Sequence, residues 1–469
     1  MLSFIKKIIK PAYSQEQLLA EVPVQKAVPL MSVPAVIGVM MILVTTLIGS
    51  YFVGLLDSEL ALAAVSVAYP LSLLSATIAM VFGAGLAASI GRCLGAKKTE
   101  ESNRLASSMF TVCTAAAFVF SALLFALSEP LFKTLGASAE VFEYAKSYFR
   151  IQLISIFFSV CSQFLNYIAA AESNMKLGAA AFILSSLLHV ILAPFFMLVL
   201  KMGLIGAAIS SLLCQLASIA VLIFPYIRKK MLIEISLKHI RLCRGMMSQV
   251  VKSGMPLGIT QILMAFSIAF TNMVGRSVLG GEGTPFIAGY GLAVKTVVMV
   301  QYLLISYMIG FQAVAAYSYG AGNKERFFDA YKHTRKVMLF ADILIAGIFF
   351  IFAKPLIRLF SGDAMIIKYG SAMITSMCLS LIISFPLPAI ITCFQATGKG
   401  GTGALVSSLR QGICYIPLIL ILPRLFSVYG FYFVQPVSDV LTVIIAFIMF
   451  SRFKRKLDND FARASNAMA

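Results

Sequence analysis

Residues 83–98 read GAGLAASIGRCLGAKK, an apolar run that ends in two lysines, and the chain returns to part of this run in its second half. With an offset of 225 residues, Gly85 coincides with Gly310, and the tripeptide 94–96 (LGA) coincides with 319–321 (YGA). Chance accounts for one such coincidence, but not for a common register over a long stretch. The sequence therefore predicts two copies of one structural unit.

The composition is that of a membrane protein. Of 469 residues, 60% are hydrophobic and 12% are charged, whereas a soluble domain carries about 25% charged residues. The excess comes in blocks of about 20 residues nearly free of charge, which is the length of one helical membrane crossing. These blocks exclude soluble enzymes, nucleic-acid-binding proteins and disordered chains.

The blocks predict an all-α polytopic membrane protein with twelve transmembrane helices. Lipid cannot satisfy free backbone amides, and the alternating pattern of a β-barrel is not seen. The predicted spans lie near residues 30–53, 61–91, 106–128, 148–171, 177–200, 203–226, 255–279, 286–316, 337–353, 370–396, 403–422 and 429–451.

The repeat divides these spans into two pseudo-symmetric six-helix bundles. Because six spans separate the repeats, both have the same orientation and are related by an axis along the membrane normal, with a cleft between them. The predicted organisation is a cytoplasmic N-terminal segment at 1–28, an N-lobe at 29–226, a basic interlobe linker at 227–254, a C-lobe at 255–451 and a cytoplasmic tail at 452–469.

The charge balance sets the predicted orientation. The chain has 38 Lys and Arg against 19 Asp and Glu, a net charge of +19, and most of the basic residues fall on one side of the predicted membrane. This asymmetry makes the basic side cytoplasmic. We expect a multi-pass protein of the cell inner (plasma) membrane, with both termini cytoplasmic, basic loops against lipid headgroups, no nucleic-acid partner and a monomeric state.

Two repeated bundles around a cleft at the membrane midplane predict a transporter that works by alternating access. No Walker sequence and no metal-ligand spacing appears, and the eight cysteines are scattered. We therefore expect a secondary transporter and not an enzyme, with no catalytic residues, no metal and no cofactor. The alternatives are a flippase for lipid-linked precursors, which a strongly basic cleft would favour, and a non-transporting scaffold, which a dry interlobe interface would favour.

Several motifs resemble the multidrug and toxic-compound extrusion (MATE) family, in particular its MepA-like bacterial branch. They are FVG at 52–54, ELALAAVSVAYPL at 59–71, GAGLAASIGRCLGAKK at 83–98, AGYGLAVKTV at 288–297 and YSYGAGNKERFFDA at 317–330. The resemblance covers nearly the whole chain. It implies export of organic, often cationic and amphipathic compounds, coupled to inward H⁺ or Na⁺.

The sequence departs from that family where cation coupling is usually assigned. The position of a first-span Asp is Gly49 here, and the Asn and Asp of the fifth span correspond to His189 and Ala193. The resemblance therefore does not identify which residues couple transport to an ion gradient.

Charged side chains inside spans are costly and by default mark a pathway. Lys295, Arg410 and Asp439 are such residues, all in the C-lobe. One interpretation is a structural ion pair of Asp439 with Lys295 or Arg410. The other is that Asp439 takes up a proton while Lys295 or a cationic drug competes for it. Asp342 is expected to face interfacial water at the cytoplasmic end of its span.

Uncharged polar residues suggest where a cavity lies. His189 occupies a position that the family uses for function, and its ordinary pKa of about 6.5 allows titration. Polar stripes on the fourth and seventh spans either join helices or line a wet cleft. The candidate substrate-cavity residues are Gln163, Asn166, Gln261, Asn272, Met264 and Gln301.

Overall fold

A computed structural model describes residues 13–54, 56, 59–127, 139–241 and 244–468, and within these ranges the chain is helical with no strand. The helices are α2 (Gln15–Ala20), α3 (Val24–Gly54), α4 (Glu59–Gly95), α5 (Thr99–Ala126), α7 (Ala139–Ala171), α8 (Met175–Pro194), η1 (Phe195–Val199), α9 (Gly203–Ile227), η2 (Leu237–His239), α10 (Arg244–Leu279), η3 (Gly280–Glu282), α11 (Gly283–Gly320), α12 (Lys324–Arg358), α13 (Ala364–Ser384), α14 (Pro386–Ala396), α15 (Gly400–Ser408), η4 (Leu409–Ile413) and α16 (Tyr415–Met468).

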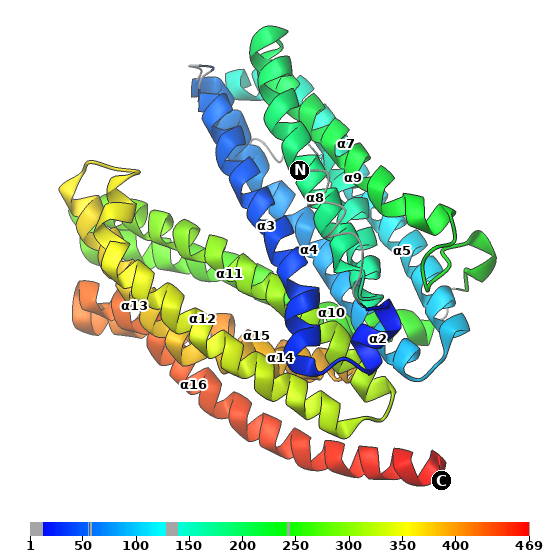
Figure 1. The fold of residues 1–469 in the computed structure, drawn as a ribbon. Coiled ribbons are helices and arrows are strands. Elements are labelled where there is room, and N and C mark those ends of the chain that lie inside the picture. The colour runs from blue at the N-terminus through cyan, green and yellow to red at the C-terminus, as the bar shows by residue number, and fades with distance from the viewer. Residues whose placement is uncertain (1–12, 55, 57–58, 128–138, 242–243, 469) are drawn as a thin grey trace.

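The helices form two lobes that meet at an angle (Figure 1). Helices α3 to α9 pack with one another in the first lobe, and α10 to α16 pack in the second. The predicted all-α architecture with two bundles is confirmed. We call these groups the N-lobe and the C-lobe.

Ten stretches of the described chain are long and apolar enough to cross a membrane. Two of them, Gly245–Gly320 with 76 residues and Gly400–Leu457 with 58, are each long enough for two crossings, since one takes about 20 residues. The chain turns within the first at η3 and within the second at Ser427, whose φ is 50°. The count of twelve stays a prediction.

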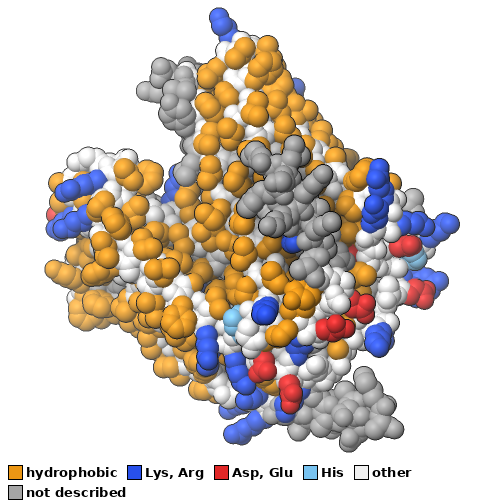
Figure 2. All heavy atoms as spheres, in the orientation of Figure 1, with side chains coloured by type: hydrophobic (Ala, Val, Ile, Leu, Met, Phe, Trp, Pro, Cys, Tyr) orange, Lys and Arg blue, Asp and Glu red, His pale blue; other side chains and the backbone are white. Residues whose placement is uncertain are grey.

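The outer surface is apolar. Large side chains such as Phe340, Ile351 and Phe118 are 71%, 70% and 65% exposed, and hydrophobic atoms cover much of the face in Figure 2. Exposed apolar surface on this scale requires a lipid environment. Basic residues concentrate near the junctions α4–α5, α9–α10 and α11–α12. We call this end of both lobes the basic end.

The segment between the lobes is fastened to the N-lobe. Helix α10 starts at Arg244, so its first turns lie inside the range predicted for the linker, because a helix can continue beyond the apolar residues that a hydropathy pattern detects. Asn103 Oδ1 of α5 accepts a hydrogen bond from Glu234 N, and Ser108 Oγ accepts one from Arg241 N, both at 2.9 Å. Residues 1–12 of the predicted N-terminal segment lie outside the described residues.

Glu172, directly after α7, holds the same segment and is fully buried. Its carboxylate accepts hydrogen bonds from Tyr226 Oη at 3.0 Å, from Leu232 N at 2.8 Å and from Ile233 N at 3.4 Å. Burial raises the pKa of Glu172 to about 7, although these hydrogen bonds lower it. The ionisable side chain of Glu172, which lies outside the membrane-spanning segments, therefore anchors the linker by hydrogen bonds.

The short helix α2 is held against the C-lobe by Arg326 of α12. The guanidinium donates to the carbonyl oxygens of Leu18 at 3.0 Å, Leu19 at 2.8 Å and Val22 at 2.7 Å. These carbonyls lie at the C-terminal end of α2, where they have no partner within the helix and where a cation is favoured. The side chain of Arg326 thus connects the N-terminal helix α2 to α12 of the C-lobe.

Candidate functional site

The lobes touch through glycines at their basic ends. A Cβ atom on Gly85 of α4 would overlap the carbonyl oxygen of Val250 of α10, and one on Gly254 would overlap the carbonyl oxygen of Val81. Helices α4 and α10 therefore cross backbone to backbone, as small residues allow in membranes. Two similar contacts join Gly91 of α4 to Ala316 of α11, and Gly310 of α11 to Ser32 of α3. We call all of these contacts together the glycine crossing.

The crossing is reciprocal, as the repeat predicts. Gly85 of the N-lobe lies against α10, and its repeat counterpart Gly310 of the C-lobe lies against Ser32 of α3. Ser32 Oγ also donates to the carbonyl oxygen of Tyr307 at 2.8 Å. Glycines that share a register in the two repeats thus occupy matching places in the interface.

Buried hydrogen bonds lock the crossing. Gln312 Nε2 of α11 donates to the carbonyl oxygen of Ala84 at 3.1 Å. Arg92 Nη1 of α4 donates to the carbonyl oxygens of Gln395 and Ala396, at the end of α14, both at 3.1 Å. These contacts all lie in the halves of the helices nearest the basic end. The hollow between the lobes in Figure 2 lies on the other side of the crossing.

A cavity with about 520 Å³ of empty space lies within the C-lobe, between α10, α11, α13, η4 and α16. This space is partly open to solvent. Met264 and Gln301, both predicted cavity residues, line it together with Ile268, Tyr290 and Gln435. Arg410 is the charged residue among its described lining residues.

Gln261, predicted to line the cavity, lies beside it. Its Nε2 donates to Tyr302 Oη of α11 at 3.1 Å. Tyr302 is in electrostatic range of Tyr167 of α7 in the N-lobe, which packs on Gly83. The side chains of Gln261, Tyr302 and Tyr167 are all half-buried. Tyr302 therefore links Gln261 to a part of the C-lobe that faces Tyr167 of the N-lobe.

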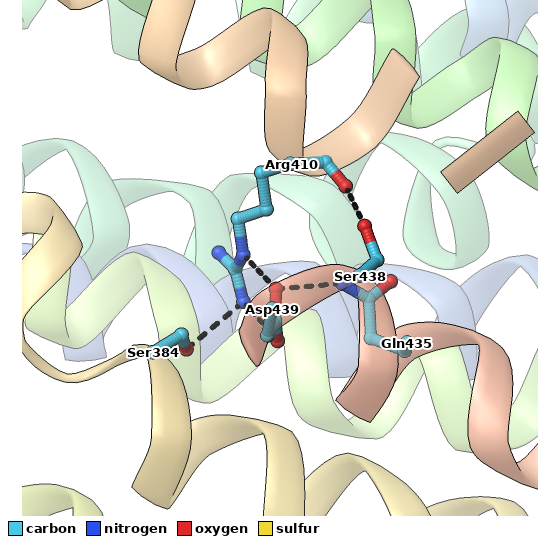
Figure 3. A network of polar contacts seen from close by, with 5 residues as sticks. All are labelled: Ser384, Arg410, Gln435, Ser438 and Asp439. Atoms are coloured by element: carbon cyan, nitrogen blue, oxygen red, sulfur yellow. Dashed lines mark hydrogen bonds and ion pairs between the residues drawn. The ribbon is translucent and has the colours of Figure 1, made fainter. Parts of the chain in front are cut away.

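Arg410 and Asp439 form a buried ion pair behind the cavity (Figure 3). Arg410 Nε lies 2.8 Å from Asp439 Oδ1, and Nη2 lies 3.3 Å from Oδ2. Arg410 Nη2 also donates to Ser384 Oγ at 3.1 Å, and Gln435 Nε2 donates to Asp439 Oδ1 at 3.1 Å. The pairing that the sequence left open is thus settled in favour of Arg410.

A π-helical turn, η4, places Arg410. The turn bonds Cys414 N to the carbonyl oxygen of Leu409 at 3.0 Å, so backbone carbonyls within it need partners outside the helix. Ser438 Oγ donates to the carbonyl oxygen of Arg410 at 2.8 Å. Ser267 Oγ donates to that of Gln411 at 2.5 Å. Helices α16 and α10 therefore fix the turn from both sides.

Lys295 does not join this pair. Its side chain is exposed on α11, and it makes no ion pair with any residue that the structure describes. Lys295 is therefore not placed to compete with a proton for Asp439 in this conformation, and the predicted competition of a cationic drug with that proton stays a prediction.

The prediction for the surroundings of Asp342 is wrong. This residue was expected to face interfacial water, but it is 4% exposed and lies on the buried face of α12 with Met338 and Ala346. The prediction was wrong because the apolar segment at 337–353 is only part of a helix that spans Lys324–Arg358. Asp342 lies close to the middle of that helix, within electrostatic range of Arg410.

In the N-lobe, His189 of α8 faces Gly49 of α3. A Cβ atom on Gly49 would lie 3.6 Å from His189 Nε2, and Ala193, one turn further along α8, is 1% exposed. The positions at which the sequence departs from the family pattern are therefore brought together by the fold. His189 is half-buried there.

The other predicted cavity residues lie away from the C-lobe cavity. Asn166 of α7 packs directly on Gly178 of α8, and Gln163 Nε2 donates to Ser159 Oγ on its own helix at 3.2 Å. Asn272 of α10 has a buried Oδ1 atom with no hydrogen-bond partner among the described residues. None of these three is among the residues that line the C-lobe cavity.

Relatives of this chain share its length and fold. A protein named "Multidrug export protein MepA" from Staphylococcus aureus is 24% identical over 442 residues, which is 93% of this chain and 96% of that protein. A protein of the same name from Staphylococcus haemolyticus is 23% identical over 441 residues, 93% and 95% of the two chains. A solved transporter of the MOP superfamily from Pyrococcus furiosus has a TM-score of 0.87 and 21% identity, covering 96% of this chain and all of that one.

A family model matches the chain twice, once in each lobe. The model is described as MatE and matches residues 34–195 and 256–421. The two matches fall on the two repeats that the glycine register predicts, and together they cover more than half of the sequence. The chain therefore belongs to the MatE family.

Proposed function

We propose that this protein is a secondary active exporter that carries small organic compounds, cationic or amphipathic in character, out of the cell in exchange for H⁺ or Na⁺. The family and the name of the Staphylococcus aureus relative support export of several unrelated compounds. The observation that carries the proposal is the glycine crossing at the basic end, combined with a cavity that it does not cover. This arrangement suits alternating access, because two rigid lobes can rock about a narrow contact.

The same proposal sets the orientation. If the basic end is cytoplasmic, as the asymmetry of Lys and Arg indicates, this conformation is closed toward the cytoplasm. Both termini then lie in the cytoplasm, the N-lobe spans 29–226 and the C-lobe 255–451, and the segment at 227–254 joins them on the inner face. We propose that one chain is sufficient for transport and that its basic loops touch lipid headgroups.

The lining of the cavity favours an exporter over a flippase for lipid-linked precursors. A flippase cleft needs positive charge for phosphate groups, whereas the charge of Arg410 is balanced by Asp439 at 2.8 Å. Met264 and Ile268 provide an adaptable apolar wall, and Gln301 and Gln435 provide hydrogen-bonding groups. Such a surface accommodates amphipathic molecules of different shape.

The test is efflux of ethidium from proteoliposomes with an imposed pH or Na⁺ gradient. We expect the wild type to export the dye when one gradient is imposed, and Asp439→Asn to lose the gradient-driven part. His189→Ala is the N-lobe comparison and should keep it. Absence of wild-type efflux under both gradients would refute the export proposal, and normal efflux by Asp439→Asn would exclude coupling through the ion pair.

A further inference from the structure

A polar layer crosses the C-lobe between two apolar clusters. Met338 of α12 belongs to the cluster near the basic end, and Ala346, two turns further along, belongs to the cluster at the opposite end. Asp342 lies between them, and Asp439 and Thr442 of α16 are both fully buried. Asp342 lies within electrostatic range of Arg410, and Arg410 pairs with Asp439 at 2.8 Å, so two carboxylates and one guanidinium share this region.

Arg410 is fully engaged by Asp439. Its Nε and Nη2 atoms donate to the carboxylate at 2.8 and 3.3 Å, and Nη2 also donates to Ser384 Oγ at 3.1 Å. Asp342 makes no hydrogen bond to any described residue, and its Oδ1 atom is buried without a partner. The two carboxylates are thus unequal, since one is compensated and the other is not.

The region needs one more positive charge than it has. If both carboxylates were ionised, two negative charges would face one guanidinium, and an uncompensated buried carboxylate is strongly unfavourable. A proton on Asp342 restores neutrality. A sodium ion fits less well, because it requires several oxygen ligands, and the described residues contain no cluster of His, Cys, Asp and Glu that could hold a metal.

Among the described residues, Arg410 is the charged group that acts electrostatically on Asp342. Of the helices in contact with α12, α11 contributes Lys295, which is exposed, and α13 contributes Lys368 near its opposite-end start. Helix α14 carries no charged residue, and α3 carries Lys26 near its basic-end start. Helix α16 packs on α12 through Phe450 and Lys454 near the basic end and carries Asp439 in the polar layer. Arg410 is therefore the cation that Asp342 can acquire by a local movement.

We propose that Asp342 is the proton-binding residue of the C-lobe, and that Arg410 is shared between Asp342 and Asp439 according to whether that proton is present. This inference rests on the proposed antiport function and assigns its proton site. With the proton bound, Arg410 stays on Asp439, as in Figure 3. When the proton leaves, the ionised Asp342 attracts Arg410 and part of the negative charge of Asp439 becomes available to the cavity.

The exchange follows from charge balance. The region accepts one extra positive charge, either a proton on Asp342 or a cationic substrate in the cavity beside Asp439 and Gln435. Binding of one disfavours the other, because together they exceed the charge that the two carboxylates can compensate. This competition is what an antiporter requires.

The first test is infrared spectroscopy of the reconstituted protein at pH 7. We expect a carbonyl stretch of a protonated carboxyl group that is lost in Asp342→Asn. Asp439→Asn should also lose it, because Arg410 then compensates the single remaining carboxylate. Glu172→Gln is the matched control, because Glu172 is a buried carboxyl group outside the membrane-spanning segments whose pKa burial raises to about 7. An unchanged band in Asp342→Asn would overturn the assignment, whether or not the protein transports anything. Asp342→Ser gives a second reading should the Asn variant fold poorly.

The second test is proton release on addition of ethidium to the purified protein in weak buffer. Linkage predicts release of up to about one proton per dye bound by the wild type and none by Asp342→Asn. Equal release by both proteins would overturn the proposal. Dye efflux that is absent from the wild type would instead refute the export function, while the infrared band would still report on Asp342.

Discussion

A methyl group added within the glycine crossing should prevent the basic ends from closing. On Gly91 of α4, a Cβ atom would lie 2.8 Å from the Cβ of Ala316 of α11, and ordinary contact begins at 3.4 Å. Since Ala316 has no side-chain torsion to relieve the overlap, the helices must separate by about 0.6 Å. On Gly85 the added atom would meet the carbonyl oxygen of Val250, which is backbone and yields even less.

The expected cost follows from overpacking. Extra methylenes in a tight interface cost about 1–3 kcal/mol, which shifts a two-state equilibrium by about 5- to 150-fold. The cost applies only to the conformation in which the lobes touch here. We therefore expect Gly91→Ala to populate a state with separated basic ends, and Gly85→Ala to populate it more strongly.

The assay is the distance between spin labels at positions 98 and 325, placed by Lys98→Cys and Glu325→Cys in a background without the native cysteines. These positions lie beside the ends of α4 and α11 that the crossing holds together. Gly347→Ala is the matched control, because a Cβ atom there meets nothing within 4 Å. Distance distributions that are identical in wild type, Gly91→Ala and Gly85→Ala would refute the reasoning, as would a change of equal size in Gly347→Ala.

Three further predictions concern the polar contacts. Burial raises the pKa of Glu172 from 4.5 to about 7. The contribution of Glu172 to the free energy of unfolding is therefore complete below pH 4.5, and about 3 kcal/mol of it is lost as the pH rises through 7. The melting temperature of the wild type should fall between pH 5 and 8 for this reason, and that pH dependence should be absent from Glu172→Gln. Arg410→Ala leaves Asp439 buried without its cation and should cost about 3–5 kcal/mol in denaturant titrations, of which the double variant with Asp439→Asn recovers part. Arg326→Ala removes three hydrogen bonds from the end of α2 and should speed amide exchange there at least about tenfold, whereas Lys332→Ala, whose side chain is 67% exposed, should not.

The architecture was predictable because membrane helices leave strong patterns. Charge-free blocks identify the crossings, and the register that joins Gly85 to Gly310 identifies the repeat. The structure gives that register a physical cause, since a Cβ atom on either glycine would overlap the other lobe, at the carbonyl oxygen of Val250 for Gly85 and at the hydroxyl of Ser32 for Gly310. Arg410 and Asp439 were found for a similar reason, because a charge in an apolar block has few structural alternatives.

Asp342 was misplaced because hydropathy reports where apolar residues begin, not where a helix begins. Basic residues at 332–336 moved the apparent start of the span toward Asp342, although α12 starts at Lys324. The spacing of Thr334, Met338, Asp342 and Ala346 by four residues was the signal that these side chains share one face. The polar stripe with Gln163 and Asn166 shows a different limit. Helical periodicity predicts which residues share a face, but it does not predict whether that face meets another helix or a cavity.

The distribution of charge between the repeats supports our proposal that coupling in this protein belongs to the C-lobe. In the register of 225 residues, Asp342, Arg410 and Asp439 correspond to Ala117, Ser185 and Cys214 of the N-lobe, and Ala117 and Cys214 are as buried as their charged counterparts. The same helical frame therefore holds an ionisable cluster in one copy and small neutral packing residues in the other. The N-lobe lacks acidic residues at Gly49 and Ala193 as well, and its His189 faces an open glycine position. We therefore infer that a cation that changes the balance between the lobes acts most directly on the C-lobe, where Arg410 lines the cavity and pairs with Asp439.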